Sequence, residues 1–321
     1  MTRFAIAIVI AICSLTGHAA AQSFPDRSIT LINPYAAGGP ADLLARTVAE
    51  GMSESLGRPV VVDNRAGAGT AIGARAVAQA KPDGYTLFIG GSPSHAITPA
   101  LMKDANYDGI KGFTPITTVA DLPNVLVVPA SSPHKTVKEL VAAAKSADGK
   151  MTFASIGVGS IPQFLGVLLQ LRADVKLVEV PYRGAAPAMV DLLGGRVDLA
   201  FLNAPAVVSQ VQSGQLRALA VASAARIKAL PETPAMTEAG YPDVAMSTWY
   251  GISAPAGTSR EVVRKLHAAI AQTLNTPKMR EKIESQGAQV VVKTPEEYAA
   301  YMQADAKLML ELIKAANMTT N

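Results

Sequence analysis

The stretch Asn33-Pro34-Tyr35-Ala36-Ala37-Gly38-Gly39-Pro40-Ala41-Asp42 joins an apolar run to a helical pattern. The run before it, Ile29-Thr30-Leu31-Ile32, is apolar and β-branched, which predicts a buried strand. After it, apolar residues recur every four positions at Leu44, Val48, Met52 and Leu56, which predicts one face of a helix that ends at Gly57. The chain is therefore expected to form a strand, a glycine turn and a helix.

The turn itself has two readings. Gly38 and Gly39 allow backbone angles that other residues avoid, and Pro40 suits the first helical position because the N–H that it lacks would be unpaired there. The free N–H groups of such a helix start, together with the helix dipole, attract an anion. The alternative is that the two glycines only make a tight turn between strand and helix.

Residues 1–21 have the pattern of a signal peptide. Arg3 supplies the positive charge, Phe4 to Leu15 the apolar core, and Ala19-Ala20-Ala21 the small residues before a cleavage site. Cys13 follows the bulky Ile12, where a lipoprotein signal has a small residue. We expect cleavage near Ala21 and a periplasmic mature protein.

Composition narrows the class of this mature protein. Cleavage removes the single cysteine and lowers the net charge from +4 to +3. The mature chain then has no disulfide and no cysteine metal site, and its length of some 300 residues favours two domains. The sequence contains no basic patch interleaved with aromatic residues, so a nucleic-acid partner is not expected.

Similar small or hydroxyl-bearing turns follow other predicted strands. They are Ser92-Pro93-Ser94-His95, Ser155-Ile156-Gly157-Val158-Gly159-Ser160 and Tyr182-Arg183-Gly184-Ala185, and another strand ends at Asn203. Alternating strands and helices predict open, mainly parallel sheets, in which ligands gather beyond the carboxyl ends of the strands. These turns are therefore expected to line one cleft.

Two crossings are expected to connect two lobes. Asn124 to Pro129 is an apolar strand after a predicted turn at Asp121-Leu122-Pro123, and the chain is expected to return between Tyr241 and Ser253. The predicted boundaries are 22–124 with 248–321 for lobe 1 and 125–247 for lobe 2. The C-terminal helix is allowed to pack across to lobe 2.

Catalysis and metal binding find less support in the sequence. The mature histidines, His95, His134 and His267, are widely separated and lack the ligand spacing of zinc sites. The sequence around Ser92 nearly matches the nucleophile motif G-x-S-x-G of hydrolases, but Ser94 stands where the last glycine should be. Pro93 after Ser92 also has no N–H for an oxyanion hole. The glycines that begin at Gly67 miss the dinucleotide-binding spacing by one residue. An exported serine hydrolase and a nucleotide-using enzyme remain as alternatives.

Several segments together resemble one family. Pro34 to Arg46, Asn64-Arg65-Ala66-Gly67-Ala68-Gly69, Pro82 to Leu87, Val180 to Ala188 and Asp191 to Asp198 are similar to signatures of the substrate-binding proteins of tripartite tricarboxylate transporters, the Bug or TctC-like family. The resemblance implies the type II periplasmic-binding-protein fold, in which a ligand cleft separates two Rossmann-like α/β lobes. It also implies a receptor that works with a membrane permease of two subunits.

The chain departs from the family pattern at a few positions that bear on the ligand. Gln163-Phe164 stands where the family often has His-Leu, and Val167 where an acidic residue is usual. An amide at position 163 both donates and accepts hydrogen bonds.

We therefore expect a monomeric exported receptor, not an enzyme, that closes over a di- or tricarboxylate, an aromatic acid or an amino acid without cofactor or metal. Its partner is the permease or, as an alternative, a sensor kinase. The expected ligand-binding residues are Tyr35, Ala37, Gly38, Gly39, Ser92, Ser94 and His95 in lobe 1, and Ser155, Gly159, Ser160, Gln163, Tyr182, Gly184, Ala185 and Asn203 in lobe 2.

Overall fold

The glycine turn folds as its sequence predicts. Strand β1 (Ile29–Asn33) leads through the turn into helix α2 (Pro40–Leu56), which has Pro40 at its start and ends at Gly57 in left-handed backbone with φ of 65°. The computed structural model describes residues 24–157, 159–285, 287–315 and 318, so the predicted signal peptide lies outside the described residues.

The described strands join in one continuous sheet with the order β2-β1-β3-β9-β4-β7-β5-β6, and β10 and β8 also pair with β4. The further strands are β2 (Val60–Asn64), β3 (Thr86–Gly90), β4 (Phe113–Pro129), β5 (Thr152–Ser155), β6 (Val178–Pro181), β7 (Leu199–Asn203), β8 (Leu216–Ala222), β9 (Ser247–Pro255) and β10 (Gln289–Val290).

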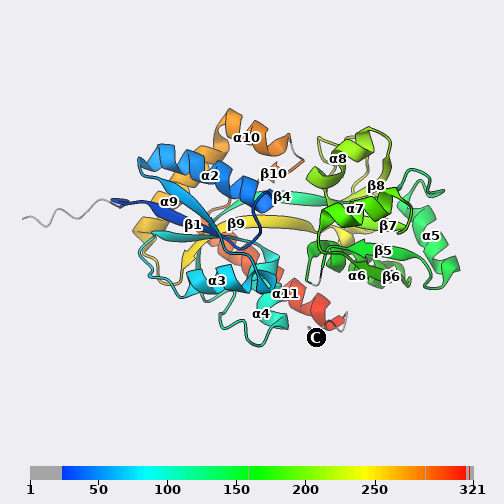
Figure 1. The fold of residues 1–321 in the computed structure, drawn as a ribbon, viewed down its shortest axis with the longest axis horizontal. Coiled ribbons are helices and arrows are strands. Elements are labelled where there is room, and N and C mark those ends of the chain that lie inside the picture. Colours follow the sequence, from blue (N-terminus) through cyan, green and yellow to red (C-terminus); the bar gives the residue numbers. More distant parts are fainter. Residues whose placement is uncertain (1–23, 158, 286, 316–317, 319–321) are drawn as a thin grey trace, which may run out of the picture.

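Helices cover both faces of this sheet, as Figure 1 shows. The further helices are α3 (Ala71–Ala78), α4 (Thr98–Leu101), α5 (Val137–Ala147), α6 (Ile161–Ala173), α7 (Ala185–Leu193), α8 (Ala204–Gln212), α9 (Arg260–Asn275), α10 (Pro277–Glu284) and α11 (Pro295–Ala315). Three short turns are also helical, namely η1 (Ala68–Thr70), the π-helical η2 (Pro93–Ile97) and η3 (Pro242–Val244).

The two ends of the sheet have separate cores, and we call them lobe 1 (β2, β1, β3) and lobe 2 (β7, β5, β6, β8). In lobe 1, Leu31 packs under α2 and α9 while its neighbour Ile32 packs under α3. In lobe 2, Val127 faces α7 and α8 while Val128 faces α5 and α6. Because successive side chains of a strand point to opposite faces, each lobe buries apolar residues on both faces of its sheet.

Strand β4 runs from lobe 1 into lobe 2, and its first part pairs with β9 in antiparallel fashion. The predicted turn at residues 121–123 is wrong, because this segment lies within β4. Up to Pro123 the strand pairs with β9, and from Asn124 it pairs with β7 and β8. The ladder changes partner at the proline, where its missing N–H does least harm to the pairing. The lobe boundaries at 124/125 and 247/248 stay predictions, because β4 passes the first without a break and β9 begins at Ser247, next to the second.

Helix α11 also joins the two cores. Its first half packs Tyr298 and Met302 against Trp249 of β9, and its second half places Met309 and Ile313 in the core of lobe 2 under α5 and α6. The helices α8 and η3 and strand β8 fall in residues 204–246, for most of which the sequence patterns predict no element. None of the described helices is both long and apolar enough to span a bilayer.

Candidate functional site

Four of the predicted turns follow the parallel strands β1, β3, β5 and β6 at their carboxyl ends. In the turn after β1, Gly38 has a φ of 82° and its N–H donates to the Asp42 carboxylate at 2.9 Å. The same carboxylate accepts hydrogen bonds from Arg46 Nε at 3.1 Å and Asn64 Nδ2 at 2.9 Å. The Arg46 hydrogen bond, followed by that of Gly38, lowers the Asp42 pKa to about 2.

Asp42 therefore already supplies a negative charge at the start of α2. Among the described residues, the backbone N–H groups of Ala36 and Ala37 have no hydrogen-bond acceptor, and both residues are exposed. Tyr35 is half-buried and lies edge-on to Tyr250 of β9 at 5.8 Å between ring centres. The free donors of this turn thus include the amides of residues 36 and 37, while the Gly38 N–H is engaged by Asp42.

The turn after β3 is buried in lobe 1. Ser92 is 1% exposed and donates from Oγ to the Asp305 carboxylate on α11 at 3.0 Å. Ser94 Oγ donates to the Gly91 carbonyl at 3.0 Å and accepts from the Gly91 N–H at 3.1 Å. Both hydroxyls are therefore engaged within the protein, although they stand where the sequence predicts ligand contacts.

His95 lies in an aromatic cluster. Its ring is stacked on Trp249 at 5.9 Å and meets Phe88 and Phe113 edge-on. Nδ1 lies 2.7 Å from the Gly109 carbonyl, which can only accept, so Nδ1 carries the proton. Burial lowers the His95 pKa to about 4. The imidazole is neutral at physiological pH and supports the turn by packing.

In lobe 2, the turn after β5 rests on a network of side chains. Ser155 Oγ donates to Glu179 Oε1 at 2.6 Å, and Gln163 Nε2 donates to both Glu179 oxygens at 2.9 and 3.1 Å. Gln163 Oε1 accepts from the Gly159 N–H at 2.8 Å. Ser160 is the N-cap of α6 and accepts from the Gln163 N–H. Four predicted site residues are thus brought together, with Glu179 beneath them.

The turn after β6 lies beside this network, because the Tyr182 N–H donates to the Ser155 carbonyl at 2.9 Å. Tyr182 Oη donates to Asp191 at 2.8 Å, and burial followed by this hydrogen bond raises the tyrosine pKa. Gly184 precedes α7 with φ of 155° and has open space around it. Gly184 and Ala185 therefore present the start of a helix beside Gly157, whose added Cβ would lie 3.9 Å from the Tyr182 carbonyl.

Asn203 lies apart from these turns, where β4 and β9 cross between the lobes. Its Nδ2 donates to Asn124 Oδ1 at 3.1 Å and to Thr248 Oγ1 at 3.0 Å. Asn124 Nδ2 also donates to Thr248 Oγ1 at 3.3 Å. The Asn203 amide therefore ties strands β4, β7 and β9 together.

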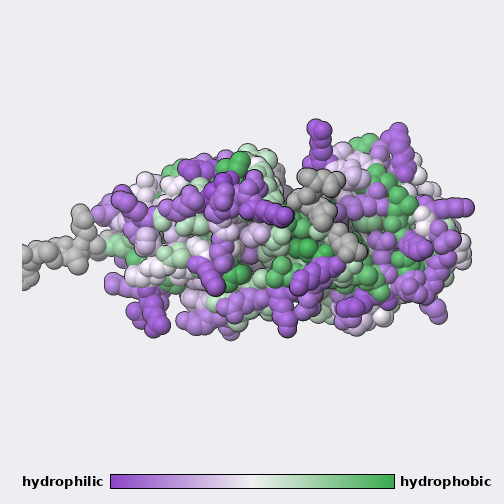
Figure 2. Space-filling model, turned by 90° about the horizontal axis from the view of Figure 1, so that it is seen from below, coloured by the Kyte–Doolittle hydropathy of each residue, from purple (hydrophilic) through white to green (hydrophobic). Residues whose placement is uncertain are grey.

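The lobes touch where two of the turns meet. Ala96 and Ile97 of η2 belong to the core of lobe 2, and a Cβ added at Gly159 would lie 2.8 Å from Ile97 Cγ2. The turns after β3 and β5 are therefore in van der Waals contact. Seen from below in Figure 2, hydrophilic residues are spread over both lobes and hydrophobic areas lie near the middle and over lobe 2.

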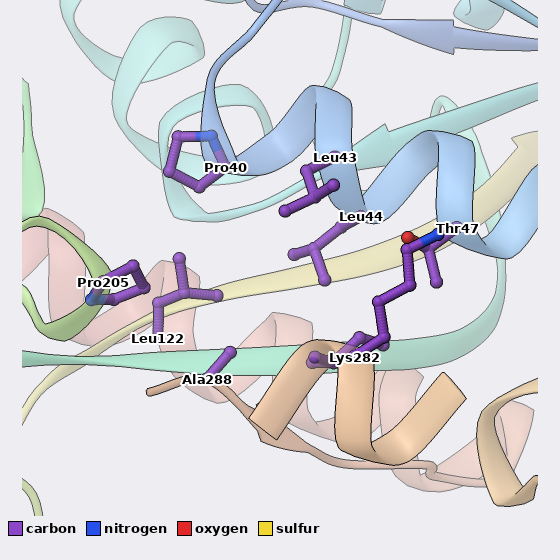
Figure 3. A pocket seen from close by; sticks show the side chains of 9 residues that line it. Pro40, Leu43, Leu44, Thr47, Leu122, Pro205, Lys282 and Ala288 are labelled. Carbon is purple, nitrogen blue, oxygen red and sulfur yellow. The ribbon is translucent and has the colours of Figure 1, made fainter. Parts of the chain in front are cut away.

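A narrow pocket lies between α2, α10 and the start of α8. Figure 3 shows Pro40 and Pro205 at its end and Leu43, Leu44 and Leu122 along it. Its cavity volume is about 10 Å³, which is room for about one water molecule. The pocket is lined mainly by apolar side chains and is too small for an organic acid.

Two carboxylates of the site were missed in the sequence, although each left a signal. Glu179 is the one charged residue of the otherwise apolar strand β6. Asp305 follows Met302 by three positions and precedes Met309 by four, so it shares the buried face of α11. The described residues contain no group of three or more histidine, cysteine or acidic side chains arranged to hold a metal ion.

Known proteins resemble the chain over most of its length. Residues 44–318 match the family model described as the tripartite tricarboxylate transporter family receptor. The protein BugT of Bordetella pertussis is 37% identical over 305 residues, which is 94% of each chain.

Two solved structures have the same fold. The periplasmic binding protein BugD is 36% identical with a TM-score of 0.79, covering 93% of this chain and 100% of that chain. R. palustris Rpa4515, solved with adipate, is 32% identical with a TM-score of 0.82, covering 92% and 99%. These likenesses confirm the predicted two-lobed α/β periplasmic-binding-protein fold.

Proposed function

Since the chain belongs to the tripartite tricarboxylate transporter family of receptors, we propose that it captures a small organic acid between its lobes and delivers it to a permease of that transporter class. The family consists of periplasmic binding proteins, which are not enzymes, and its relative Rpa4515 holds adipate. We further propose that the ligand of this chain is also a carboxylate. We also propose that the chain is exported and that its signal peptide is cleaved near Ala21.

The arrangement of the turns supports this proposal. Free amides at the turn after β1 face solvent in lobe 1, and the start of α7 is open in lobe 2. Exposed N–H groups and a helix N-terminus hold a carboxylate without any arginine. In our proposal the free amide of Ala37 contacts the acid from lobe 1, where Gly38 and Gly39 set the shape of the turn, and Ser160, Gly184 and Ala185 contact it from lobe 2.

The buried residues of the predicted site act indirectly in this proposal. Ser94 and His95 hold the turn after β3 in shape, and Ser155 and Gln163 do the same for the turn after β5. Ser92 has no histidine partner among the described residues and donates to Asp305, which leaves the serine-hydrolase alternative without a base for its nucleophile.

Closure would be driven by contacts that the ligand makes only in the closed form. The contact between Gly159 and Ile97 and the ion pair between Lys228 of lobe 2 and Glu284 of α10, at 3.6 Å, are compatible with such a closed form. The Lys228 side chain is 94% exposed, so this pair is worth little by itself.

A substitution at Gly38 tests the site. Gly38→Val should distort the turn, because a β-branched residue is strained at a φ of 82°, and should weaken binding of adipate or another acid about tenfold or more in calorimetry. Gly240→Val is the matched control, since Gly240 in lobe 2 has a φ of 90° and likewise open space. Equal affinities for the two variants would contradict the proposed site.

A further inference from the structure

Glu179 engages two side-chain hydrogen-bond donors of the predicted site in lobe 2. Its carboxylate receives the Ser155 hydroxyl and both contacts of the Gln163 amide nitrogen, at 2.6 to 3.1 Å. The amide oxygen of Gln163 is in turn used by the Gly159 N–H. Ser155 and Gln163 are buried, at 0% and 6% exposure, so these pairings are shielded from water.

The position of Glu179 brings this charge close to the cleft. It lies on β6 two residues before the end of the strand and is half-buried. One hydrogen bond separates it from Gln163, and a second separates Gln163 from Gly159, which lies against Ile97 of η2, the turn after β3. The negative charge therefore lies directly beneath the turn that meets the other lobe.

We propose that Glu179 is a specificity-determining residue, which makes lobe 2 reject a second carboxylate and accept a hydrogen-bond donor such as an amide or an ammonium group. This rests on the proposed function, that of a carboxylate receptor. The preferred ligand is then a monocarboxylate whose far end carries an N–H donor, in contrast to the dicarboxylate held by the relative Rpa4515.

Electrostatics sets the size of this preference. Two like charges about 6 Å apart, at an effective dielectric constant near 20, repel enough to weaken binding about a hundredfold. A ligand carboxylate would also find Ser155 and Gln163 already engaged, so it would lose its own hydration without replacement. An amide or ammonium group donates to the lone-pair site that these three hydrogen bonds leave free on the Glu179 carboxylate and avoids both costs.

Matched ligand pairs test the proposal. The dicarboxylates from succinate to adipate, the monoamide of each, and the corresponding ω-amino acids are titrated into the mature protein by calorimetry. The wild-type protein should bind the monoamide or the amino acid about tenfold or more tightly than the dicarboxylate of the same length. In Glu179→Gln, whose amide still accepts from Ser155, that ratio should fall towards one or invert.

Asp198→Asn is the control variant. Asp198 is also a lobe 2 carboxylate and accepts from the N–H and hydroxyl of Thr152, but at the opposite end of β5. Asp198→Asn removes one negative charge from lobe 2, as Glu179→Gln does. It should leave the ratio of the affinities for the monoamide or amino acid and for the dicarboxylate unchanged. A wild-type preference for the dicarboxylates, or a ratio that Glu179→Gln does not alter, would overturn the inference while the proposed receptor function stands. If none of these acids binds the wild-type protein, the proposed function fails and the inference with it.

Discussion

Ser92, in the turn after β3, donates a 3.0 Å hydrogen bond to the carboxylate of Asp305, which lies 213 residues later on α11. The acceptor stands between the half of α11 that packs on Trp249 and the half that packs in lobe 2. A polar contact thus ties α11, the helix that joins both cores, to the turn after β3. Burial, with a contribution from the Asp121 carboxylate, raises the Asp305 pKa to about 6.

The first prediction concerns Asp305 and pH. Because its pKa is higher in the folded than in the unfolded protein, the folded state holds the proton more tightly, and its stability falls as pH rises from about 4 through about 6. Asp305→Asn keeps an acceptor for Ser92 and should raise the free energy of unfolding at pH 7.5 by about 1 kcal/mol. Thermal unfolding between pH 4 and pH 8, at about one-unit steps, measures both effects.

In Asp305→Asn the dependence of the free energy of unfolding on pH should become weaker but not disappear, since burial also raises the Asp121 pKa to about 6. Glu311→Gln, an exposed change on the same helix, should leave both slope and stability as they are. If Asp305→Asn destabilises the protein at pH 7.5, the carboxylate is worth more to the fold in its charged form than its burial implies.

The second prediction concerns Asp42 and has the opposite sign. Its pKa of about 2 lies below the usual range, so the stability that it contributes is present above about pH 4 and is lost as pH falls towards 2. Asp42→Asn should lower the free energy of unfolding at pH 7 by about 1 kcal/mol and flatten its fall below pH 4. Asp63→Asn is the control, because the Asp63–Arg65 pair is exposed on both sides and should contribute almost nothing.

The difference between Asp42 and Asp305 shows what could be predicted from the sequence. The pairing of Asp42 with Arg46 is one helical turn long, and the helix start at Pro40 and end at Gly57 are equally local. Such features depend on neighbours along the chain, so spacing alone predicts them. Ser92 looks like a free hydroxyl at a strand end until the fold brings α11 against it.

The same reason explains the mistaken turn at residues 121–123 and the hydrogen-bond partner of Gln163. Asp121-Leu122-Pro123 has turn chemistry, yet pairing with β9 keeps it extended, so tertiary pairing overrides the local pattern. The ligand contact of Gln163 stays a prediction, and its hydrogen bond to Glu179 on β6 depends on the fold and cannot be predicted from spacing.

The third prediction concerns the crossing between the lobes. Thr248 Oγ1 accepts from Asn203 and Asn124, so Thr248→Val would leave two amide donors without this acceptor and should cost about 1–3 kcal/mol of stability in urea unfolding. Thr47→Val is the matched control. The Thr47 hydroxyl on α2 is buried and has no partner in the described part of the chain, so valine there should be neutral or stabilising. If Thr248→Val and Thr47→Val lose the same amount of stability, the hydrogen bonds at the crossing contribute nothing beyond an ordinary buried hydroxyl.

The fourth prediction tests closure at the contact between the turns. Gly159→Ala places a methyl group 2.8 Å from Ile97 Cγ2, closer than van der Waals contact, so the lobes must separate or the turn must shift. Gly157→Ala, in the same turn, also has a positive φ, but its Cβ meets only the Tyr182 carbonyl, at 3.9 Å. Both variants have the strain of an alanine in left-handed backbone, about 1 kcal/mol, and only Gly159→Ala obstructs closure.

The acid affinity of Gly159→Ala should therefore fall further than that of Gly157→Ala in calorimetry. In solution scattering with ligand, the radius of gyration of Gly159→Ala should exceed that of Gly157→Ala. Adding Ile97→Ala removes the obstructing methyl group and should restore part of the lost affinity. If the two alanine variants bind the acid equally and show the same radius, closure does not depend on this contact.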